Sequence, residues 1–430
     1  PAACRHERAG STDRQGSRVS GDILFLAHRI PFPPDRGDKI RSHHLLKALA
    51  ELAPVHVATF AETAADRAQE PHLASLAASH CLVDRAKPLP LAGLQALIRR
   101  EPVSLAAFRH PAIAAFVART LEQRPVDTIY VFSGQMGQYI PREWGGRLIT
   151  DLGDVDSAKF ASYEKQAPWP QSRLFAREDR LLRADEERLA RVSDRTLLIS
   201  DAEAALLRSR LNDPEGARIE ALGNGIDCAA FDPATTAGHP ELAATPGPHF
   251  VFTGQMDYPP NIAAAERFAR SILPEIRTTH LAAQFHIVGR APTAAVRALQ
   301  GRAGVRVWGE VPAVQPFLAA ADLVVVPLTI ARGIQNKVLE AMAMACPVLL
   351  TPDAATGIAA TDEVHFAIEG SDCGFVSRAL ALLADRAGAT AMGAAARRFV
   401  IETMSWPAML APLPRIVGRE ARRARRRDAA

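Results

Sequence analysis

A lysine and a glutamate three residues apart form the part of this sequence best suited to binding a phosphate. Lys337 and Glu340 follow the apolar run 324–327 and a short loop that contains Gly333. Their spacing places both side chains on one face of a helix that begins in this loop. A helix start offers free backbone N–H groups and the positive end of the helix dipole, which suit a diphosphate. We therefore expect Lys337 to add positive charge there and Glu340 to accept hydrogen bonds from ribose hydroxyls. The alternative is a surface Lys–Glu pair on an ordinary amphipathic helix.

Short apolar runs that alternate with helical patterns must position these groups. Such alternation predicts parallel sheets with helices on both faces, whose ligands bind beyond the carboxyl ends of the strands. The pattern starts at residue 23 and starts again at Phe250 after a proline-rich stretch. In order along the chain, the predicted strands are 23–27, 55–60, 128–132, 148–151, 196–200, 250–253, 285–288, 305–308, 323–327 and 347–351.

The restart of the pattern predicts an α/β chain with two Rossmann-like, doubly wound domains that face a central cleft. A chain of 430 residues also exceeds what a single core usually supports. Pro407 is expected to interrupt the last helix, which then crosses back to the first domain. The predicted segments are an N-terminal tail 1–20, a first domain 21–228, a linker 229–248, a second domain 249–403, a returning helix 404–418 and a basic tail 419–430.

Composition excludes several classes of protein. The formal net charge is only +4, which does not favour a nucleic-acid binder. The five cysteines form no CxxC pair, so we expect neither a disulfide framework nor a zinc site, and a cytoplasmic protein. No apolar run has the length of a membrane span. The arginines between Arg419 and Arg427 are either a solvated tail or a peripheral contact with an anionic membrane.

The segment around Lys337 resembles the donor-binding signature of the group 1 glycosyltransferases, the retaining family also called family 4. The matching string is Lys337-Val338-Leu339-Glu340-Ala341-Met342-Ala343, followed by Pro347-Val348. The resemblance implies a GT-B fold, a nucleotide-sugar donor and an acceptor that is a glycan or a lipid-linked sugar. It implies retention of the anomeric configuration, no metal and no cofactor.

The resemblance also assigns roles to neighbouring residues. It implies that Glu340 binds the ribose, whereas the family's first glutamate falls on Arg332, which is not acidic. Either Asn336 or Gln335 would then replace that contact to the donor sugar, or the sugar itself would differ. The remaining donor-binding positions that it implies are Gly333, Ile334, Gly254 and Gln255. Residues 224–227 resemble the family's Asn-Gly-x-Asp hinge, for which a plain turn is the alternative.

The loop 31–41 resembles the family's glycine-containing loop near the donor phosphates and the acceptor. Its implied contacts come from Gly37, Asp38, Lys39 and Arg41. A structural loop with solvated charges is the alternative. These strings, with 151–157 and 331–337, resemble the sugar transferases that accompany exosortase (PEP-CTERM) and exopolysaccharide systems. The resemblance extends from about Asp22 to Trp406.

Asp154 and Asp156 follow the predicted strand 148–151 and could orient an acceptor hydroxyl or stabilise positive charge on the sugar ring. They also spell the Asp-x-Asp motif that binds metal in single-domain glycosyltransferases. A turn or helix cap is a third reading.

Two rival functions remain open. A non-hydrolysing nucleotide-sugar epimerase would share the fold and the donor site but would need no acceptor. A non-catalytic sugar-nucleotide-binding partner is suggested by Arg332, and it would bind a nucleotide without turning it over.

Overall fold

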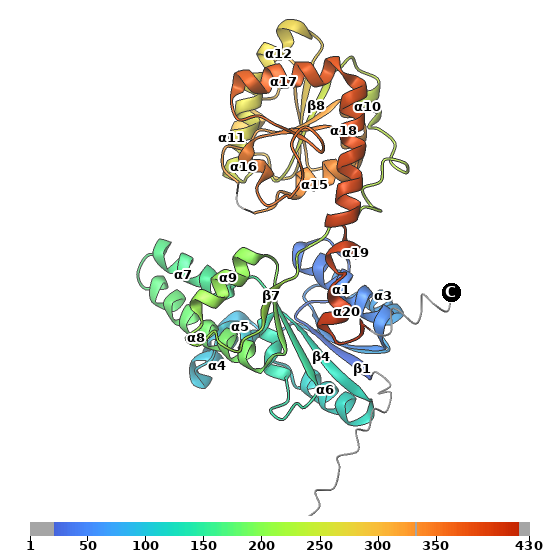
Figure 1. Ribbon diagram of the computed structural model, residues 1–430. Helices are drawn as coiled ribbons and strands as arrows, with labels where there is room; N and C mark the ends of the chain where they lie inside the picture. Colours follow the sequence, from blue (N-terminus) through green and yellow to red (C-terminus); the bar gives the residue numbers. More distant parts are fainter. Residues whose placement is uncertain (1–20, 332, 421–430) are drawn as a thin grey trace, which may run out of the picture. The chain divides into compact units, whose positions relative to one another are not determined.

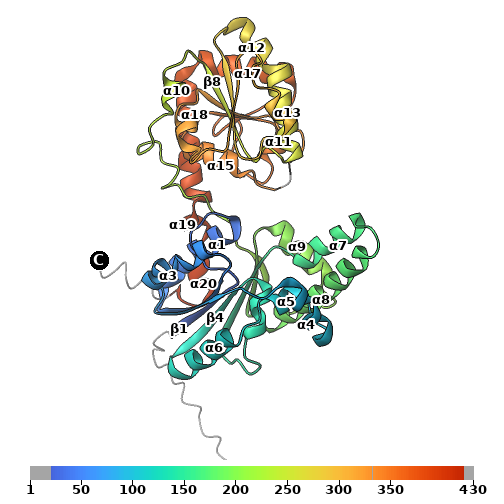
Figure 2. The ribbon, with the colours of Figure 1, turned by 180° about the vertical axis from the view of Figure 1, so that it is seen from behind.

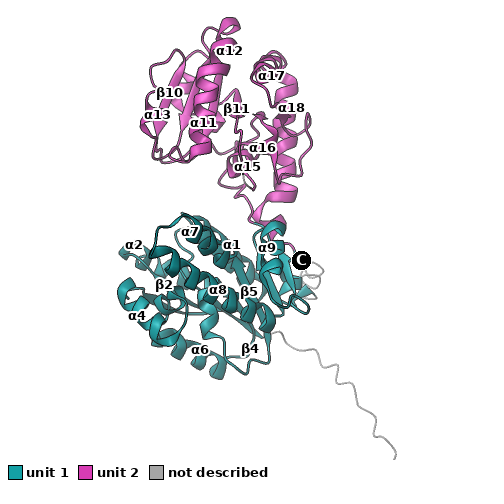
Figure 3. Ribbon diagram, turned by 90° about the vertical axis from the view of Figure 1, so that its left-hand side faces the viewer, with its two compact units in different colours: residues 1–223, 412–430 teal, residues 224–411 magenta. Residues whose placement is uncertain are grey.

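The computed structural model describes residues 21–331 and 333–420, and the chain divides into two compact units. Unit 1 comprises residues 1–223 and 412–430, and unit 2 comprises residues 224–411 (Figure 3). Each unit contains one parallel sheet covered by helices. The predicted fold class, two doubly wound α/β halves, is confirmed.

The sheet of unit 1 has the strand order β3-β2-β1-β4-β5-β6-β7, with every pairing parallel. Its strands are β1 (Asp22–Ala27), β2 (Val55–Ala61), β3 (Ser79–Asp84), β4 (Val126–Phe132), β5 (Arg147–Gly153), β6 (Arg195–Leu198) and β7 (Ile219–Ala221). Ile23 of the central strand β1 is in register with Val55 on one side and Thr128 on the other. Strands covered on both faces are mostly apolar, and β1 and β2 are buried along almost their whole length.

Two layers of helices cover the sheet of unit 1. The helices are α1 (Gly37–Leu52), α2 (Ala64–Arg67), α3 (Glu70–Leu76), α4 (Leu89–Arg99), α5 (Val103–Ala107), α6 (Pro111–Gln123), the 3-10 helix η1 (Gly134–Tyr139), α7 (Asp156–Gln166), α8 (Gln171–Val192), α9 (Asp201–Arg210) and α20 (Leu413–Ile416). Helix α1 packs against α3 and α20 in one layer, whereas η1 contacts α5, α6 and α8 in the other (Figure 1).

The sheet of unit 2 has the order β10-β9-β8-β11-β12-β13 and is again parallel throughout. Its strands are β8 (His249–Thr253), β9 (Gln284–Val288), β10 (Val305–Gly309), β11 (Leu323–Val326), β12 (Val348–Leu350) and β13 (Ala367–Ile368). In both units the strand order reverses beside the first strand, between β1 and β4 and between β8 and β11. Such a switch point is where ligands bind in open parallel sheets.

The helices of unit 2 also form two layers. They are α10 (Pro240–Ala243), α11 (Pro259–Arg267), the π-helix η2 (Phe268–Ile272), α12 (Leu273–Thr279), α13 (Ala294–Arg297), α14 (Gln315–Ala319), α15 (Asn336–Ala343), α16 (Pro352–Ala355), α17 (Asp372–Ala384), α18 (Arg386–Phe399), the π-helix η3 (Val400–Met404) and α19 (Trp406–Met409). Helices α11, α12 and α17 contact one another through η2, and α15 packs against α18.

The chain passes between the units at 223–224 and at 411–412. The segment 229–248, expected as a linker, belongs to unit 2, where Leu242 is buried in the core. The last helix is interrupted near Pro407 as expected: Ser405 has extended backbone and caps α19. The returning segment consists of two short helices, of which α19 lies in unit 2 and α20 in unit 1.

Arg419 corrects the expectation of a basic tail that starts at this residue. Its side chain is 2% exposed and pairs with Asp127 at 2.6 Å, so it is part of the packing of unit 1. The other tail arginines, from 422 onward, lie outside the described residues. Within 21–331 and 333–420, no helix combines the length and the apolar character that a membrane crossing requires.

Candidate functional site

The switch point of unit 2 brings together the residues with the strongest predicted role in donor binding. The loop after β8 contains Gly254 and Gln255, and the loop after β11 leads into α15, which carries Lys337 and Glu340. Both loops leave the carboxyl ends of adjacent strands. The Lys337 ammonium lies only 3.1 Å from where a Cβ atom on Gly254 would be, so the two loops meet.

Lys337 occupies a largely desolvated position without a carboxylate partner. Its Nζ donates to Oδ1 of Asn261 at 2.5 Å and lies 4.8 Å from the centre of the Phe252 ring. Within the described residues, the Glu340 carboxylate acts on Lys337 through space and forms no ion pair with it. Burial lowers the pKa of Lys337 to about 8, which Glu340 offsets only in part. A cation held in this way is stabilised when an anion binds beside it.

Two glycines allow the loops of this site to approach closely. A Cβ on Gly254 would lie 2.9 Å from Nδ2 of Asn261, and one on Gly289 would lie 1.6 Å from the Gly254 carbonyl oxygen. The Asn261 amide also donates to the Gln255 carbonyl at 2.8 Å. Any larger residue at Gly254 or Gly289 would therefore separate the β8 loop from its neighbours.

Three residues of this site were not singled out individually from the sequence. Asn261 and Phe252 lie in the segment 252–261, which contains no lysine or arginine. Arg290 follows β9, is exposed, and donates to the Gln255 side chain at 3.0 Å. The sequence signal for Arg290 is its position directly after a buried strand and a glycine. Arg290 places a second cation beside the loop that follows β8.

The start of α15 lacks a side-chain cap, which leaves room for an anion beside its first turn. The Gln335 side chain at the N-cap position makes no capping hydrogen bond, while its backbone carbonyl accepts from the Val338 N–H at 2.9 Å. The Gln335 amide donates to the Gly333 carbonyl at 3.1 Å, Ile334 lies beside Gly357, and Asn336 is exposed. Arg332 lies outside the described residues.

Glu340 lies one turn further along α15 and is half-buried. Burial raises the pKa of Glu340, and the nearby Lys337 charge opposes this shift. A carboxylate in such surroundings gains by accepting hydrogen bonds, which is the role expected of it toward a ribose.

In unit 1, Asp38 is already engaged by its neighbours. It lies in the first turn of α1 and accepts hydrogen bonds from Arg29 at 2.6 Å and Arg36 at 2.9 Å. Burial would raise the pKa of Asp38, but the hydrogen bonds and charges of His28 and Arg29 outweigh it and hold the pKa well below its usual range. Gly37, at the start of α1, faces open space.

The structure buries Lys39 and Arg41 in ion pairs, in contrast to the expected loop of accessible charge. Lys39 Nζ lies 2.5 Å from Asp66, and Arg41 lies 2.8 Å from Asp151, whose side chain is 0% exposed. The Tyr130 hydroxyl donates to the same Asp151 carboxylate at 2.9 Å. Both cations are satisfied inside unit 1, because a charge so deeply buried requires a partner. We therefore leave them out of the proposed ligand site.

Asp154 and Asp156 lie together after β5 and share one partner. Lys159 Nζ donates to Asp154 at 3.2 Å and to Asp156 at 3.0 Å. The neighbouring carboxyl of Glu186 is buried and accepts from Ser157, both from its backbone N–H at 2.9 Å and from its hydroxyl. Burial raises the pKa of Glu186 to about 7, although the Ser157 hydrogen bonds act against this shift. In the described part of the chain, no group of three or more His, Cys, Asp or Glu side chains could hold a metal ion.

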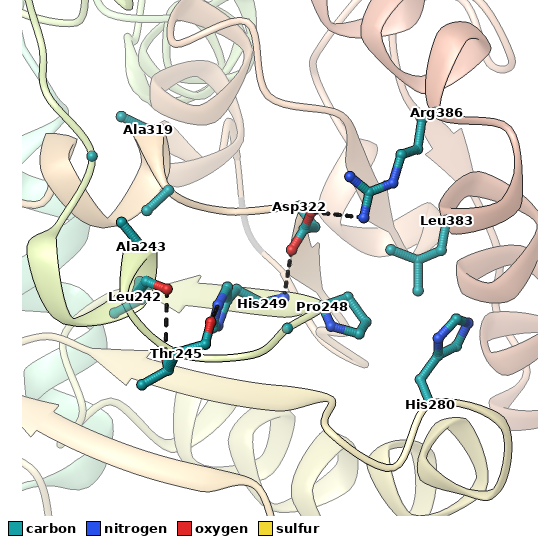
Figure 4. A pocket seen from close by; sticks show the side chains of 13 residues that line it. Leu242, Ala243, Thr245, Pro248, His249, His280, Ala319, Asp322, Leu383 and Arg386 are labelled. Carbon is teal, nitrogen blue, oxygen red and sulfur yellow. Dashed lines mark hydrogen bonds and ion pairs between the residues drawn. The ribbon is translucent and has the colours of Figure 1, made fainter.

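A hollow of about 510 Å³ in unit 2 lies at the opposite ends of the strands from Lys337 (Figure 4). It is lined by His249 at the start of β8, Asp322 just before β11, and Arg386. Asp322 accepts from the His249 backbone N–H at 2.8 Å and faces Arg386 at 3.8 Å. Because it lies at the amino ends of the strands, we do not assign the donor to it.

Comparison with known families gives a match for the part of the chain that contains Lys337. Residues 247–385 match the family model described as glycosyl transferases group 1. Over this range unit 2 is similar to the group 1 glycosyltransferases. The matched range runs from β8 to the end of α17 and so includes Gly254, Lys337 and Glu340. No curated protein sequence matches the chain significantly.

Solved structures match the chain over both units. HepE from Anabaena, in complex with UDP, has a TM-score of 0.60 at 14% identity and covers 92% of this chain and 99% of its own. Sucrose-phosphate synthase from Thermosynechococcus elongatus has a TM-score of 0.55 at 16% identity, with 92% and 98% covered. WaaG, a glycosyltransferase involved in lipopolysaccharide biosynthesis, has a TM-score of 0.52 at 18% identity, with 92% and 100% covered. At these identities the likeness shows the GT-B fold. Together with the family match, it indicates a glycosyltransferase.

Proposed function

We propose that this chain transfers a sugar from a nucleotide-sugar donor to an acceptor, with retention of the anomeric configuration. The observation that carries the proposal is Lys337, a desolvated ammonium at the switch point of unit 2 that forms no ion pair with a carboxylate of the described residues. Perturbed titratable groups of this kind are typical of functional sites. HepE, which shares the fold, has been solved with UDP-glucose, which supports a donor of this class.

In this proposal the donor diphosphate binds at Lys337 and the open start of α15. Glu340 accepts hydrogen bonds from the ribose, and residues 333–336 together with Arg332 contact the sugar. Gly254 and Gln255 form the opposite wall, where Asn261 keeps the ammonium in place through the bond at 2.5 Å. When the diphosphate binds, a charge-assisted hydrogen bond from Lys337 to a phosphate oxygen replaces the weaker hydrogen bond to the Asn261 amide.

The reaction breaks the bond between the sugar's anomeric carbon and the diphosphate oxygen and forms one from that carbon to an acceptor oxygen. The acceptor approaches on the face that the diphosphate leaves, and a diphosphate oxygen takes the acceptor proton. Lys337 and the helix dipole stabilise the negative charge that develops on the leaving group. Because these groups belong to the protein, turnover is expected to survive EDTA. A loss that manganese restores would instead make Asp154 and Asp156 metal ligands.

The acceptor is assigned to the carboxyl edge of the unit 1 sheet, beyond β1, β4 and β5. Gly37 leaves open space there, and Asp154 or Asp156 would orient an acceptor hydroxyl once Lys159 releases it. We propose a glycan or lipid-linked sugar acceptor in exopolysaccharide or cell-surface glycan synthesis, as in the exosortase-associated subgroup. The terminal arginines would allow a peripheral contact with an anionic membrane.

A thermal-shift screen against UDP-, GDP- and ADP-sugars tests the donor site directly. A ligand at a hundred times its dissociation constant adds about 2.7 kcal/mol to the free energy of unfolding. Lys337→Ala is the matched control and should lose most of the shift. The donor that binds is then incubated alone and with candidate acceptors, and the products are followed by NMR, which reports the anomeric configuration. Conversion of the sugar by the chain alone would establish the epimerase, and binding without any turnover would establish the non-catalytic partner.

A further inference from the structure

Helix α4 (Leu89–Arg99) of unit 1 has its small and large apolar residues in unusual places. Its buried residues are Ala92 and Ala96, both fully covered. Its large apolar residues are exposed: Leu89 by 63%, Leu91 by 46%, Leu94 by 56%, Leu97 by 59% and Ile98 by 74%. An ordinary surface helix buries its large apolar side chains and exposes polar ones. Helix α4 does the reverse.

The exposed side chains form one continuous face. At 100° per residue, Leu97, Leu94, Ile98 and Leu91 fall within an arc of about 120°, opposite the two buried alanines. We call these four residues the α4 face. Figure 1 and Figure 2, which view the molecule from opposite sides, both show α4 at the outer side of unit 1 next to α5 and α8.

Two hollows lie next to helix α4, and one of them adjoins the α4 face. A hollow of about 440 Å³ is lined by Ile98 together with Pro111 and Arg99. Another hollow, of about 310 Å³, is lined by Leu89, Phe108 and Phe175 and lies outside the face. The α4 face itself is an exposed apolar patch, and patches of this kind mark interaction sites.

Positive charge borders the α4 face. Arg99 ends the helix and Arg100 caps it, and both side chains are exposed. An apolar face bordered by arginines is the composition of helices that lie in the interface of an anionic membrane, where the apolar side enters the acyl boundary and the cations meet the headgroups.

From this arrangement we propose that the α4 face is a docking surface for an anionic lipid bilayer. A helix of 11 residues is only about 16 Å long, so the face that it presents is far below the roughly 800 Å² per partner of a stable protein interface. A bilayer imposes no such area and no shape match. This inference goes beyond the proposed donor chemistry and does not depend on which sugar is transferred.

Vesicle flotation of the full chain tests the surface, with phosphatidylglycerol–phosphatidylcholine vesicles compared with pure phosphatidylcholine at low and high salt. The triple variant Leu94→Gln/Leu97→Gln/Ile98→Gln should bind the anionic vesicles at least about tenfold more weakly. Arg99→Gln/Arg100→Gln should weaken binding about thirtyfold at low salt, at about 1 kcal/mol per arginine. Leu281→Gln is the matched control, because Leu281 is 77% exposed in unit 2, and it should bind as the wild type does.

Two further variants make the outcome decisive. In Leu94→Trp, the new indole should shift its emission to shorter wavelength when anionic vesicles are added. A chain that ends at Glu420 should still bind, because the α4 face supplies the apolar contact.

The proposal is overturned if the triple variant binds like the wild type. It is also overturned if only the shortened chain loses binding, which would locate the contact in the last ten residues. A wild-type dimer that the triple variant converts to a monomer, without vesicle binding, would assign the face to a second copy. Donor turnover is measured in the same samples, because it tests the proposed transferase activity independently of vesicle binding.

Discussion

The two sheets of this protein have the same strand order around their switch points, yet the cations beside them differ in the groups that contact them. In unit 1, Arg41 and Lys39 are buried and each is paired with a carboxylate. In unit 2, Lys337 is held by the neutral amide of Asn261 and by the face of Phe252. A buried charge that is paired is already neutralised, whereas a buried cation without a carboxylate partner is stabilised most when an anion binds beside it.

We expect this contrast to separate residues that stabilise the fold from residues that bind a ligand. Position at the carboxyl edge of a sheet is common to both sets and so does not decide the role. In our proposal, the presence or absence of an acidic partner decides the role of the cation. Removing a paired cation should therefore damage stability, and removing the unpaired one should damage activity. The predictions below test that division, beginning with the largest expected effect.

Arg41→Ala should lower the free energy of unfolding of unit 1 by about 3–5 kcal/mol. The substitution leaves the Asp151 carboxylate buried and without its countercharge. Hydrogen exchange should report the loss in peptides from β1, β4 and β5. The double variant Arg41→Met/Asp151→Asn is the control: it removes both charges, keeps an acceptor for Tyr130 and should recover much of the loss. Unchanged exchange in Arg41→Ala would show that the pair does not stabilise the unit.

Lys337→Ala should reduce turnover by about 10²–10³-fold, or about 2.7–4 kcal/mol, as expected when one preorganised charge-stabilising group is lost. Its stability should not fall, because the removed ammonium was desolvated and had no carboxylate partner. Steady-state kinetics and a thermal melt on the same sample check both parts. If a correctly folded Lys337→Ala protein keeps wild-type turnover, Lys337 does not have the central role that we propose for it.

Glu340→Gln should weaken binding of donor and free nucleotide by about tenfold or more, since a hydrogen bond to a charged group contributes roughly 1.5–3 kcal/mol. The ribose contact exists in the ground state and in the transition state, so kcat should change little. Isothermal titration calorimetry with the nucleotide, beside kinetics at saturating donor, separates these effects. A fall in kcat at unchanged affinity would place Glu340 at the reacting atoms instead.

The strands that could be predicted from the sequence are those covered on both faces. β1, β2, β8 and β11 are short apolar runs, and each was expected within one or two residues of its observed bounds. The strands that escaped prediction lie at or near sheet edges: β3 (Ser79–Asp84), β7 (Ile219–Ala221) and β13 (Ala367–Ile368). They are partly exposed or only two or three residues long, so they leave little apolar signal.

In the candidate site, too, groups that are close in sequence could be predicted, whereas contacts between residues distant in sequence could not. Lys337, Glu340 and Gly333 lie within one loop and one helix, so their spacing could single them out as candidates. The partners of the other cations are distant in sequence: Asp66 is 27 residues from Lys39, and Asp151 is 110 residues from Arg41. Asn261 is 76 residues from Lys337. A single sequence shows the charge but not the residue that pairs with it, and so it could not distinguish the two kinds of cation.

The smallest predicted effect is a pH dependence that only the unpaired cation can produce. The pKa of Lys337 is lowered from 10.5 to about 8 by burial. Between these two values the unfolded chain binds a proton that the folded chain does not, so this group's contribution to stability rises with pH across that window. Below pH 8 the folded state bears the full cost of the desolvated charge, and Lys337→Met should accordingly melt at a higher temperature than the wild type at pH 7. Above pH 8 the two melting temperatures should converge.

Donor binding should show the opposite dependence, because the diphosphate needs the charged form. Affinity should fall above pH 8 by up to about tenfold per pH unit, and binding at pH 9 should take up about 0.9 proton. Calorimetry in two buffers of different ionisation enthalpy measures that uptake with the nucleotide found in the thermal-shift screen. In Lys337→Arg the cation stays charged throughout this range, so both the uptake and the loss of affinity should disappear. If the arginine variant keeps the wild-type pH profile, another group controls the affinity, and the contrast between the paired and unpaired cations no longer explains where this protein binds its ligand.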